Sequence, residues 1–412
     1  MDIRIEPRRL SGAVTPPPSK SMAHRLIITA ALSGGISTIR NVSFSQDIEA
    51  TLRCMKALGT GVEQTDENTL RIHGLGHSIP QAPLPGGALL HFDCGESGST
   101  LRFMIPVALA VAGGGVFTGR GRLMERPQKP YFDLFDEKGI SYEQTGGILT
   151  VRGRLTPGEY RLPGNVSSQF FTGLLLALSQ LDAPSDIVST TALESADYIY
   201  MTIDAMAAAG AAVTVSEDGR SFHVTPSAYQ AFDGTVEADW SQAGFWYAAN
   251  FLDNRLDIRG LNPRSAQGDM VVSDLYWKLA RPGDVTVDLS GCPDLLPPLA
   301  VMAAVRNGTT FFVNAARLRI KESDRLATVH NLLAALGGKS EELPEGLTVY
   351  GQPILAGGSV DGANDHRIVM AAAIAATACR SPVTISGAQA VNKSYPSFWD
   401  EYQRLGGDIH VL

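Results

Sequence analysis

A dense group of charged residues lies at 317–325, which reads Arg-Leu-Arg-Ile-Lys-Glu-Ser-Asp-Arg. Six of its nine residues are charged, whereas 18% of the whole chain is charged. On a helix, Lys321 and Arg325 would share one face, with Glu322 beside them. Two cations and a carboxylate at the start of a helix suit an anionic substrate that also needs a proton moved. Taken alone, the run also fits a solvated turn with surface ion pairs.

The elements around such residues must position them. Five stretches are apolar on nearly every side, which predicts helices buried all round, with sheets outside them: 22–32, 100–111, 168–178, 295–305 and 368–376. Each begins with a polar cluster, and helix N-termini present free N–H groups that bind anions. Serine and aspartate N-caps explain part of this pattern. They do not explain Lys20, Arg102 and Arg367 near the same helix starts.

A longer pattern also repeats along the chain. A helix that ends at glycine, followed by a turn and an alternating hairpin, recurs with glycines near 59, 139, 210, 338 and 407. A sixth, degenerate copy is expected around 275–289. Six copies fit two α/β domains of three repeats each. We expect a continuous domain at 18–236 and a discontinuous one at 1–17 and 237–412, with Pro16-Pro17-Pro18 as a stiff connector.

Composition excludes several classes of protein. The net charge of −8 argues against a nucleic-acid partner. The longest apolar run, 368–379, is too short to cross a bilayer, so we expect no membrane association. The four cysteines lack C-x-x-C spacing and predict reduced, mostly buried thiols in a cytoplasmic protein. Neither a phosphate loop, a dinucleotide fingerprint nor metal-ligand spacing is complete, so we expect no cofactor and no metal.

Taken together, the motifs resemble the enolpyruvyl transferase family over essentially the full chain. They occur in family order with family-like spacing: Pro18-Ser19-Lys20-Ser21 with Arg25, Gly98 with Arg102, Arg122 to Pro127, Val166-Ser167-Ser168-Gln169, Ser195 with Tyr198, Pro293-Asp294, Lys321 to Arg325, Asp365-His366-Arg367, and Lys393. The resemblance implies two inside-out α/β domains, each of three helix-plus-hairpin repeats with buried helices, joined by a two-strand hinge. It favours the branch that moves the enolpyruvyl group of phosphoenolpyruvate to the 5-hydroxyl of shikimate 3-phosphate, in chorismate and aromatic amino acid biosynthesis.

The resemblance also implies a role for each matching position. Shikimate 3-phosphate would contact Lys20, Ser21, Arg25, Ser167, Ser168, Gln169, Ser195, Asp294 and Lys321, mainly from the continuous domain. Phosphoenolpyruvate would contact Lys20, Gly98, Arg122, Gln169, Arg325, Arg367 and Lys393. Asp294 would accept the hydroxyl proton, and Glu322, helped by Lys393, would protonate the methylene carbon, with Lys20 between both substrates. Supporting positions would be Arg102, Tyr198, Arg317, Asp365 and His366.

The sequence departs from the family pattern at four positions and leaves two alternative functions open. Glu96, Arg317, Pro18 and Ser99 replace residues that are usual in the family. The unbranched Gly98 is expected to leave space for glyphosate, the family's known inhibitor. One alternative is the sister enzyme that acts on UDP-N-acetylglucosamine, and another is a non-catalytic binder of phosphate ligands. We expect a monomer whose partners are its small-molecule substrates.

Overall fold

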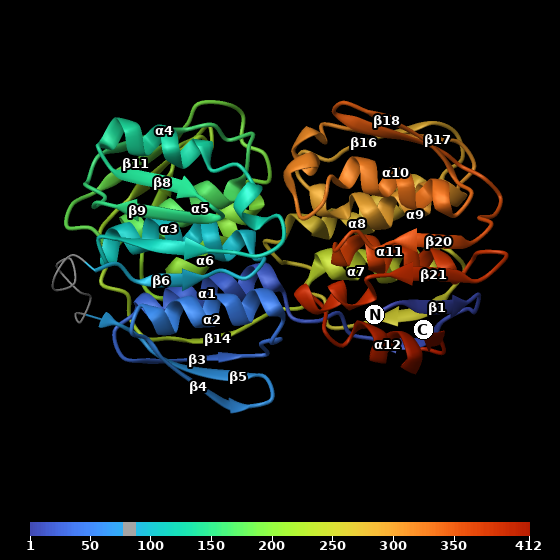
Figure 1. The fold of residues 1–412 in the computed structure, drawn as a ribbon, viewed down its shortest axis with the longest axis horizontal. Coiled ribbons are helices and arrows are strands. Elements are labelled where there is room, and N and C mark those ends of the chain that lie inside the picture. The colour runs from blue at the N-terminus through green and yellow to red at the C-terminus, as the bar shows by residue number, and fades with distance from the viewer. Residues whose placement is uncertain (77–87) are drawn as a thin grey trace. The chain divides into compact units, whose positions relative to one another are not determined.

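The computed structural model describes residues 1–76 and 88–412 (Figure 1). Its internal contacts divide the chain into a continuous unit, Pro18–Glu237, and a discontinuous unit, Met1–Pro17 with Ala238–Leu412. The chain therefore crosses between the units twice, after Pro17 and after Glu237. Our sequence-based boundary assigned Glu237 to the discontinuous domain, whereas its contacts group it with residues 18–236.

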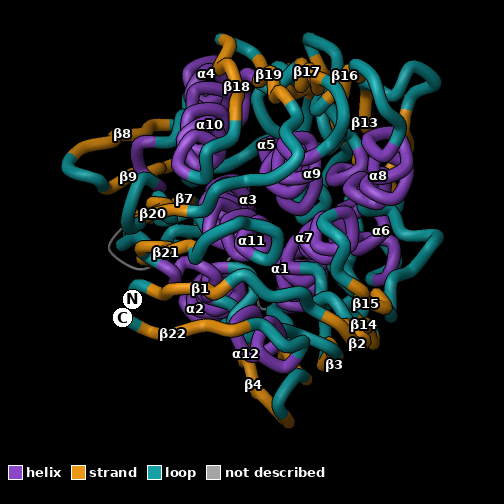
Figure 2. Tube along the Cα trace, turned by 90° about the vertical axis from the view of Figure 1, so that its right-hand side faces the viewer, coloured by secondary structure: helices purple, strands orange, loops and turns teal. Residues whose placement is uncertain are grey.

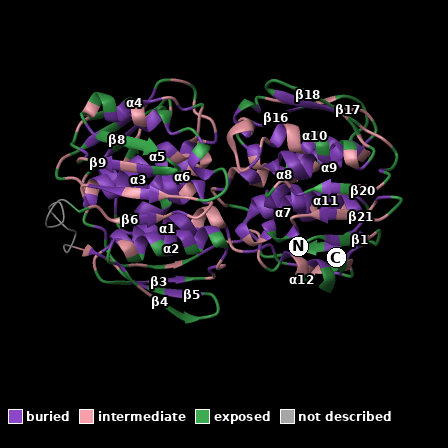
Figure 3. Ribbon diagram, viewed as in Figure 1, coloured by how far each residue is buried: buried purple, intermediate pink, exposed green. Residues whose placement is uncertain are grey.

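The centre of the continuous unit is formed by α1 (Lys20–Leu32), α3 (Gly98–Val111) and α5 (Ser168–Leu178). Helices that are apolar on nearly every side are stable only when neighbours cover them all round. The structure buries almost every residue of α3 and α5, as Figure 3 shows. Their close approach requires Gly173, because a Cβ atom there would lie 2.5 Å from the carbonyl oxygen of Arg102.

Strands, orange in Figure 2, lie around the purple helices. Among the described residues, each sheet of the continuous unit combines a parallel pair of strands with an antiparallel hairpin. A partly exposed helix precedes each hairpin, namely α2 (Gln46–Ala57), α4 (Lys129–Lys138) or α6 (Asp197–Ala208). The strand orders are β14-β3-β5-β4, β6-β7-β9-β8 and β10-β11-β13-β12. Their bounds are β3 Ile36–Arg40, β4 Gly61–Asp66, β5 Thr69–His73, β6 His91–Asp93, β7 Gly114–Thr118, β8 Ser141–Thr145, β9 Ile148–Arg152, β10 Glu159–Leu162, β11 Ser185–Ser189, β12 Val213–Val215, β13 Ser221–Val224 and β14 Asp233–Thr235.

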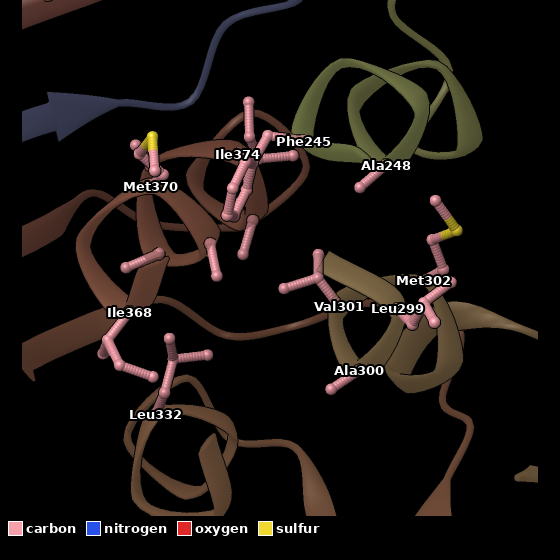
Figure 4. Close-up of a cluster of buried hydrophobic side chains, with 14 of the residues drawn as sticks. Phe245, Ala248, Leu299, Ala300, Val301, Met302, Leu332, Ile368, Met370 and Ile374 are labelled. Atoms are coloured by element: carbon pink, nitrogen blue, oxygen red, sulfur yellow. The ribbon is translucent and has the colours of Figure 1, made fainter. Parts of the chain in front are cut away.

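The discontinuous unit is built in the same way around α7 (Trp240–Phe251), α9 (Leu296–Val305) and α11 (His366–Ala376). Figure 4 shows Phe245, Val301 and Ile374 among the buried side chains that fill the space between these helices. The outer helices are α8 (Val272–Ala280), α10 (Arg325–Ala335) and α12 (Phe398–Arg404).

The sheets of the discontinuous unit run in the orders β16-β17-β19-β18, β20-β21-β1-β22 and β15-β2. The N-terminal strand β1 pairs antiparallel with both β21 and β22, so the first residues of the chain complete a sheet made by the last ones. The bounds are β1 Ile3–Glu6, β2 Ser11–Val14, β15 Arg255–Ile258, β16 Val285–Asp288, β17 Thr309–Val313, β18 Lys339–Leu343, β19 Gly346–Tyr350, β20 Gly358–Asp361, β21 Val383–Ser386 and β22 Asp408–Val411.

The degenerate repeat departs from the prediction for residues 275–289. The helix is present as α8, but β16 pairs parallel with β17 in the next sheet and does not close a hairpin. Only residues 281–284 separate α8 from β16, which is too short a stretch for another strand and its turn. The strands β2 and β15 therefore form a small parallel sheet of their own.

The predicted fold class is confirmed, since buried helices lie inside each unit and sheets lie around them. The sequence missed one buried helix, α7, because Ser241, Gln242 and Asn250 interrupt its apolar pattern. All four cysteines are free and buried, as expected. No helix in residues 1–76 and 88–412 is long and apolar enough to cross a membrane.

Candidate active site

In the continuous unit, polar side chains gather at the N-terminal ends of α1, α3 and α5. Each helix has a serine N-cap whose hydroxyl accepts a backbone hydrogen bond, namely Ser19, Ser97 or Ser167. A capped helix start directs its remaining N–H groups and its positive dipole end at whatever lies beyond it. Side-chain contacts of Lys20, Thr100 and Gln169 join these helix starts.

Lys20 is held by a carboxylate that the sequence analysis did not single out. Its Nζ donates a hydrogen bond of 2.7 Å to Asp47 Oδ2 in the first turn of α2. The two side chains are 16% and 9% exposed, so the ion pair is largely shielded from water. Thr100 on α3 donates to the carbonyl oxygen of Asp47 at 3.4 Å. The start of α2 therefore connects the starts of α1 and α3.

Gln169, which we expected to touch both substrates, bridges α3 and α5. Its Oε1 accepts a 2.9 Å hydrogen bond from Arg102 Nη1, and its Nε2 donates to Ser99 Oγ at 2.9 Å. Arg102 is buried, and its guanidinium lies 4.7 Å from the ring centroid of Phe170. In this structure Arg102 thus orients Gln169.

Arg25 is buried between α1, α5 and α6. Most of its N–H groups donate hydrogen bonds to oxygen atoms of the protein. It donates to the carbonyl oxygens of Ser21 at 2.6 Å and of Tyr198 at 2.8 Å. It also donates to Thr172 and Thr202. Burial lowers the pKa of Arg25 to about 10, so the guanidinium stays charged at neutral pH. A phosphate at this place would have to share these donors with the protein.

Ser195 lies two residues before the start of α6 and has a φ of 53°, in the left-handed region that serine rarely adopts. It is 4% exposed. Residues held in such conformations concentrate at functional sites, where the surrounding structure offsets the strain. The substrate contact that the resemblance implied for Ser195 stays a prediction.

Gly98 begins α3, and the guanidinium of Arg126 occupies the space beside it. A Cβ atom at Gly98 would lie 2.2 Å from Arg126 Nη1, so only glycine fits while Arg126 keeps this position. The predicted ligand Arg122 is more exposed than Arg126, and its Nε lies 3.8 Å from Glu125 Oε2. Glu96 approaches the same loop, because a Cβ atom at Gly121 would lie 2.7 Å from its Oε2.

In the discontinuous unit, three carboxylates surround one buried arginine of the charged run. Arg325 is 1% exposed, and its guanidinium pairs with Asp294 at 2.7 Å, Glu322 at 2.9 Å and Asp365 at 2.9 Å. Bidentate arginine–carboxylate geometry fixes orientation as well as charge. Asp294 and Glu322, the carboxylates expected to move protons, therefore bind the same guanidinium group.

Lys321 and Arg325 would share a face only if both lay on one helix, and Lys321 lies outside α10. The side chain of Asp324 accepts a hydrogen bond from Ala327 N and caps α10, so the helix begins only at Arg325. Residues 316–320 form a short 3-10 helix, η6 (Ala316–Ile320), and Lys321 follows it in extended backbone. Lys321 still reaches the cluster, since its Nζ lies 3.5 Å from Asp294 Oδ1.

Cations surround Asp294, which belongs to the 3-10 helix η5 (Pro293–Leu295) in front of α9. Arg367 Nη2 lies 3.2 Å from Asp294 Oδ2, in addition to the contacts from Arg325 and Lys321. Burial alone would raise the pKa of Asp294, but Arg367, Lys321 and Arg325 bring it well below its usual range. Burial lowers the pKa of Lys321 to about 8, although Asp294 opposes this shift.

Residues behind this cluster hold it in place. Asp365 is fully buried, pairs with Arg325, accepts a hydrogen bond from Ser323 Oγ at 2.9 Å and caps α11 through Arg367 N. His366 is likewise buried on the first turn of α11. Lys393 Nζ donates to the carbonyl oxygen of Asn364 at 2.6 Å.

Arg317, which departs from the family pattern, is 8% exposed. Its Nη2 donates to the carbonyl oxygen of Ser290, three residues before Pro293. Arg317 therefore ties η6 to the loop that precedes Asp294.

Comparisons with known proteins agree with this arrangement. Residues 5–402 match the family described as EPSP synthase (3-phosphoshikimate 1-carboxyvinyltransferase). The chain is 43% identical to the 3-phosphoshikimate 1-carboxyvinyltransferase of Clostridium acetobutylicum, over 99% of this chain and 98% of that protein. It is 41% identical to the enzyme of the same name from Clostridium novyi, with the same coverage.

Solved structures share the fold. EPSP synthase from Acinetobacter baumannii superposes with a TM-score of 0.79 at 22% identity, and each chain is fully covered. The enolpyruvyl transferase NikO from Streptomyces tendae gives a TM-score of 0.77 at 17% identity, over 99% of this chain and 98% of that one. The full-length family match and the relatives above 40% identity decide the assignment: the chain belongs to the EPSP synthase family.

Proposed function

We propose that this member of the EPSP synthase family transfers the enolpyruvyl group of phosphoenolpyruvate to the 5-hydroxyl of shikimate 3-phosphate. The products are 5-enolpyruvylshikimate 3-phosphate and phosphate. The observation that carries the proposal is the pairing of Asp294 and Glu322 on the buried guanidinium of Arg325. Two carboxylates on one cation can serve as base and acid in the same reaction. We further propose a cytoplasmic monomer.

In this proposal the substrate contacts are those that the family resemblance implies for the residues of each unit. In the continuous unit, Lys20 and the capped starts of α1 and α5 hold shikimate 3-phosphate, and Gly98 at the start of α3 contacts phosphoenolpyruvate. In the discontinuous unit, Lys321 contacts shikimate 3-phosphate, and Arg325, Arg367 and Lys393 contact phosphoenolpyruvate. Arginine forks suit both its phosphate and its carboxylate.

The chemical step is an addition followed by an elimination. The 5-hydroxyl oxygen forms a bond to C2 of phosphoenolpyruvate while Asp294 takes the hydroxyl proton. Glu322 delivers a proton to C3, so the double bond becomes a single bond, C3 becomes a methyl group and a tetrahedral intermediate forms at C2. In the elimination C3 returns a proton to the Glu322 carboxylate, the double bond is restored, and the C2–O bond to phosphate breaks as phosphate leaves. The cations around the site stabilise the charge that develops on the phosphate oxygens.

The low pKa of Asp294 makes it a weak base in the free protein. Phosphoenolpyruvate brings its own anionic groups to Arg325 and Arg367, which then share their charge between substrate and protein. With its cations partly engaged elsewhere, Asp294 becomes more basic when the substrate is bound. Substrate binding thereby activates the base at the time when it is needed.

Lys321 gives the proposed shikimate 3-phosphate contact a dependence on pH. Since its folded pKa is about 8, the ammonium group loses its proton as pH rises above 8. We expect kcat/KM for shikimate 3-phosphate to fall above this pH, approaching about tenfold per pH unit, because kcat/KM reports the free enzyme. The variant Lys321→Arg keeps its charge and should lack this decline. An equal decline in both proteins would show that another group titrates.

Gly98 is expected to control phosphoenolpyruvate binding through Arg126. In Gly98→Ala the new methyl group requires Arg126 to move, and overpacking of this kind costs about 1–3 kcal/mol. We expect KM for phosphoenolpyruvate to rise about tenfold or more, and inhibition by glyphosate to weaken if it competes for the same place. The control is Gly34→Ala, where the nearest atom is 3.8 Å away. If KM were unchanged in Gly98→Ala, Arg126 would be free to move at no cost.

The substrate is tested by mixing the protein with phosphoenolpyruvate and one acceptor at a time while phosphate release is followed. Release with shikimate 3-phosphate and not with UDP-N-acetylglucosamine supports the proposal. The opposite preference would assign the chain to the sister reaction. Binding of shikimate 3-phosphate without phosphate release under any mixture would indicate a non-catalytic binder.

A further inference from the structure

A series of buried hydrogen bonds connects α1, α2 and α3 through residues that the sequence analysis did not assign to the site. It begins at His24 on α1, whose Nδ1 lies 2.7 Å from Thr51 Oγ1 on α2. Thr51 Oγ1 in turn lies 2.7 Å from Thr100 Oγ1 on α3. Helix α2 lies beside both α1 and α3 (Figure 1). The bonds therefore connect α1 to α3 across α2.

The last bond of the series reaches the start of α3. The Thr100 hydroxyl donates to Ser97 Oγ at 2.8 Å, and the same oxygen accepts from Thr100 N at 3.2 Å as the N-cap of the helix. Gly98, the proposed phosphoenolpyruvate contact, directly follows this cap. The carbonyl oxygen of Asp47 is a second, more distant acceptor for Thr100 Oγ1, at 3.4 Å. The position of Thr100 therefore affects the loop that places Gly98.

No side chain of the series can exchange its partner for water. His24, Thr51, Ser97 and Thr100 are each 0% exposed. A buried polar group without a hydrogen-bond partner is costly, so the bonds must satisfy one another. Each hydroxyl has a single O–H group to donate, so the bonds have to run in one direction from end to end.

The ring of His24 decides this direction. Burial lowers the pKa of His24 well below its usual value, and Lys20 and Arg25 lower it further, so the ring is neutral and carries one N–H group. No described residue is hydrogen-bonded to Nε2, and the ring packs edge-on to Phe103 with centroids 6.3 Å apart. A proton on Nε2 would leave a buried donor unpaired, whereas a proton on Nδ1 is donated to Thr51.

We propose that His24 is a positioning residue for phosphoenolpyruvate binding: it donates its Nδ1–H group to Thr51 and so orders the bonds that fix the start of α3 at Gly98. The inference rests on the proposed function. Thr51 and Thr100 then each accept one hydrogen bond and donate one. A helix start held in this way keeps its N–H groups directed at an anionic ligand. His24 itself is given no substrate contact.

The variant His24→Leu tests this role, because it fills the space of the ring and removes the donor. KM for phosphoenolpyruvate should rise about three- to tenfold, since the start of α3 loses one buried hydrogen bond that orders it. KM for shikimate 3-phosphate should change less, because Gly98 is not among its proposed contacts. His24→Asn should bring KM for phosphoenolpyruvate back towards the wild-type value, because its amide places an N–H group near the position of Nδ1.

Further variants keep the result interpretable if His24→Leu does not fold. Thr51→Val keeps the shape of the side chain and removes the hydroxyl, so it should raise KM for phosphoenolpyruvate in the same way, whereas Thr51→Ser should not. The matched control is His330→Leu. His330 Nδ1 lies 2.9 Å from Ser340 Oγ, so this variant removes the same kind of bond outside the site and should leave both KM values unchanged.

NMR of the protein with ¹⁵N-labelled histidine reports the tautomer of His24 directly, because couplings to the ring protons distinguish Nδ1 from Nε2. The signals of His24 are identified by their absence from His24→Asn. We expect the proton on Nδ1. A proton on Nε2 would reverse the direction of the bonds and overturn the inference.

The kinetic outcomes separate the two proposals. If the wild type turns over but His24→Leu and Thr51→Val keep its KM for phosphoenolpyruvate, the role of His24 is overturned and the proposed function stands. Equal rises in KM for both substrates, without recovery in His24→Asn, would indicate a merely structural residue and also overturn it. Absence of turnover in the wild type would overturn both.

Discussion

Replacing Glu322 with glutamine is expected to lower kcat by about 10³-fold, because the amide cannot protonate C3 of phosphoenolpyruvate. The change keeps the size of the side chain and its hydrogen-bonding distance to Arg325, which is 2.9 Å in the wild type. KM for either substrate should therefore change little. Steady-state kinetics with both substrates, measured on protein of wild-type thermal stability, provides the comparison.

A matched control lies in the same region. Glu342 pairs with Arg319 at 2.7 Å and is 31% exposed, so Glu342→Gln removes a carboxylate from an arginine outside the site. It should leave kcat unchanged. Equal turnover by Glu322→Gln and the wild type would refute the assigned role of Glu322 and require another proton donor.

The variant Arg325→Ala is expected to lose both activity and stability. Its guanidinium compensates Asp294, Glu322 and Asp365 at once, and removing one partner of a buried ion pair costs about 3–5 kcal/mol. Arg325 is also a proposed ligand of phosphoenolpyruvate, so kcat/KM should fall by at least about 10³-fold. Thermal unfolding and steady-state kinetics measure the two effects.

The stability loss in Arg325→Ala should depend on pH. In the wild type, burial alone would raise the pKa values of Asp294 and Asp365, but their cations hold them below the usual value. Each therefore contributes stability above its unfolded pKa near 4, and this contribution is lost as pH falls through the lower, folded pKa. Without Arg325 both pKa values rise, so the variant should begin to lose stability at a higher pH than the wild type.

Arg319→Ala is the control for this variant. Arg319 is 29% exposed and pairs with Asp324 at 2.8 Å and Glu342 at 2.7 Å, so it has comparable partners without comparable burial. Exposed ion pairs contribute about 0–1 kcal/mol. If Arg325→Ala were no less stable than Arg319→Ala, the buried cluster would not be a source of stability.

Much of the fold could be predicted because its main features depend on local sequence patterns. An all-round apolar stretch such as 295–305 predicts a buried helix from composition alone, and Gly139 or Gly210 marks the end of a helix. The hairpin missing after α8 was harder to foresee. Whether residues 285–288 pair with a neighbouring hairpin or with β17 is decided by tertiary contacts between distant segments.

At the candidate site, the sequence predicted where helices start better than it predicted which side chains contact one another. Asp324 is a recognisable N-cap, so the start of α10 at Arg325 was readable from sequence. That Arg325 would bind Asp294 and Asp365 was not, because these residues lie 31 and 40 positions away in the chain. Asp47 was missed for the same reason, since the sequence around a carboxylate does not show which partner it will face.

The chemistry is tested most directly by running the reaction of phosphoenolpyruvate with shikimate 3-phosphate in D₂O and examining the product by proton NMR. Addition followed by elimination passes through a methyl group that carries one solvent-derived hydrogen and loses one of its three. The mechanism therefore predicts deuterium in the vinyl CH₂ group of the product, and little product from Glu322→Gln. A product formed at the normal rate with a fully protonated vinyl group would contradict protonation of C3.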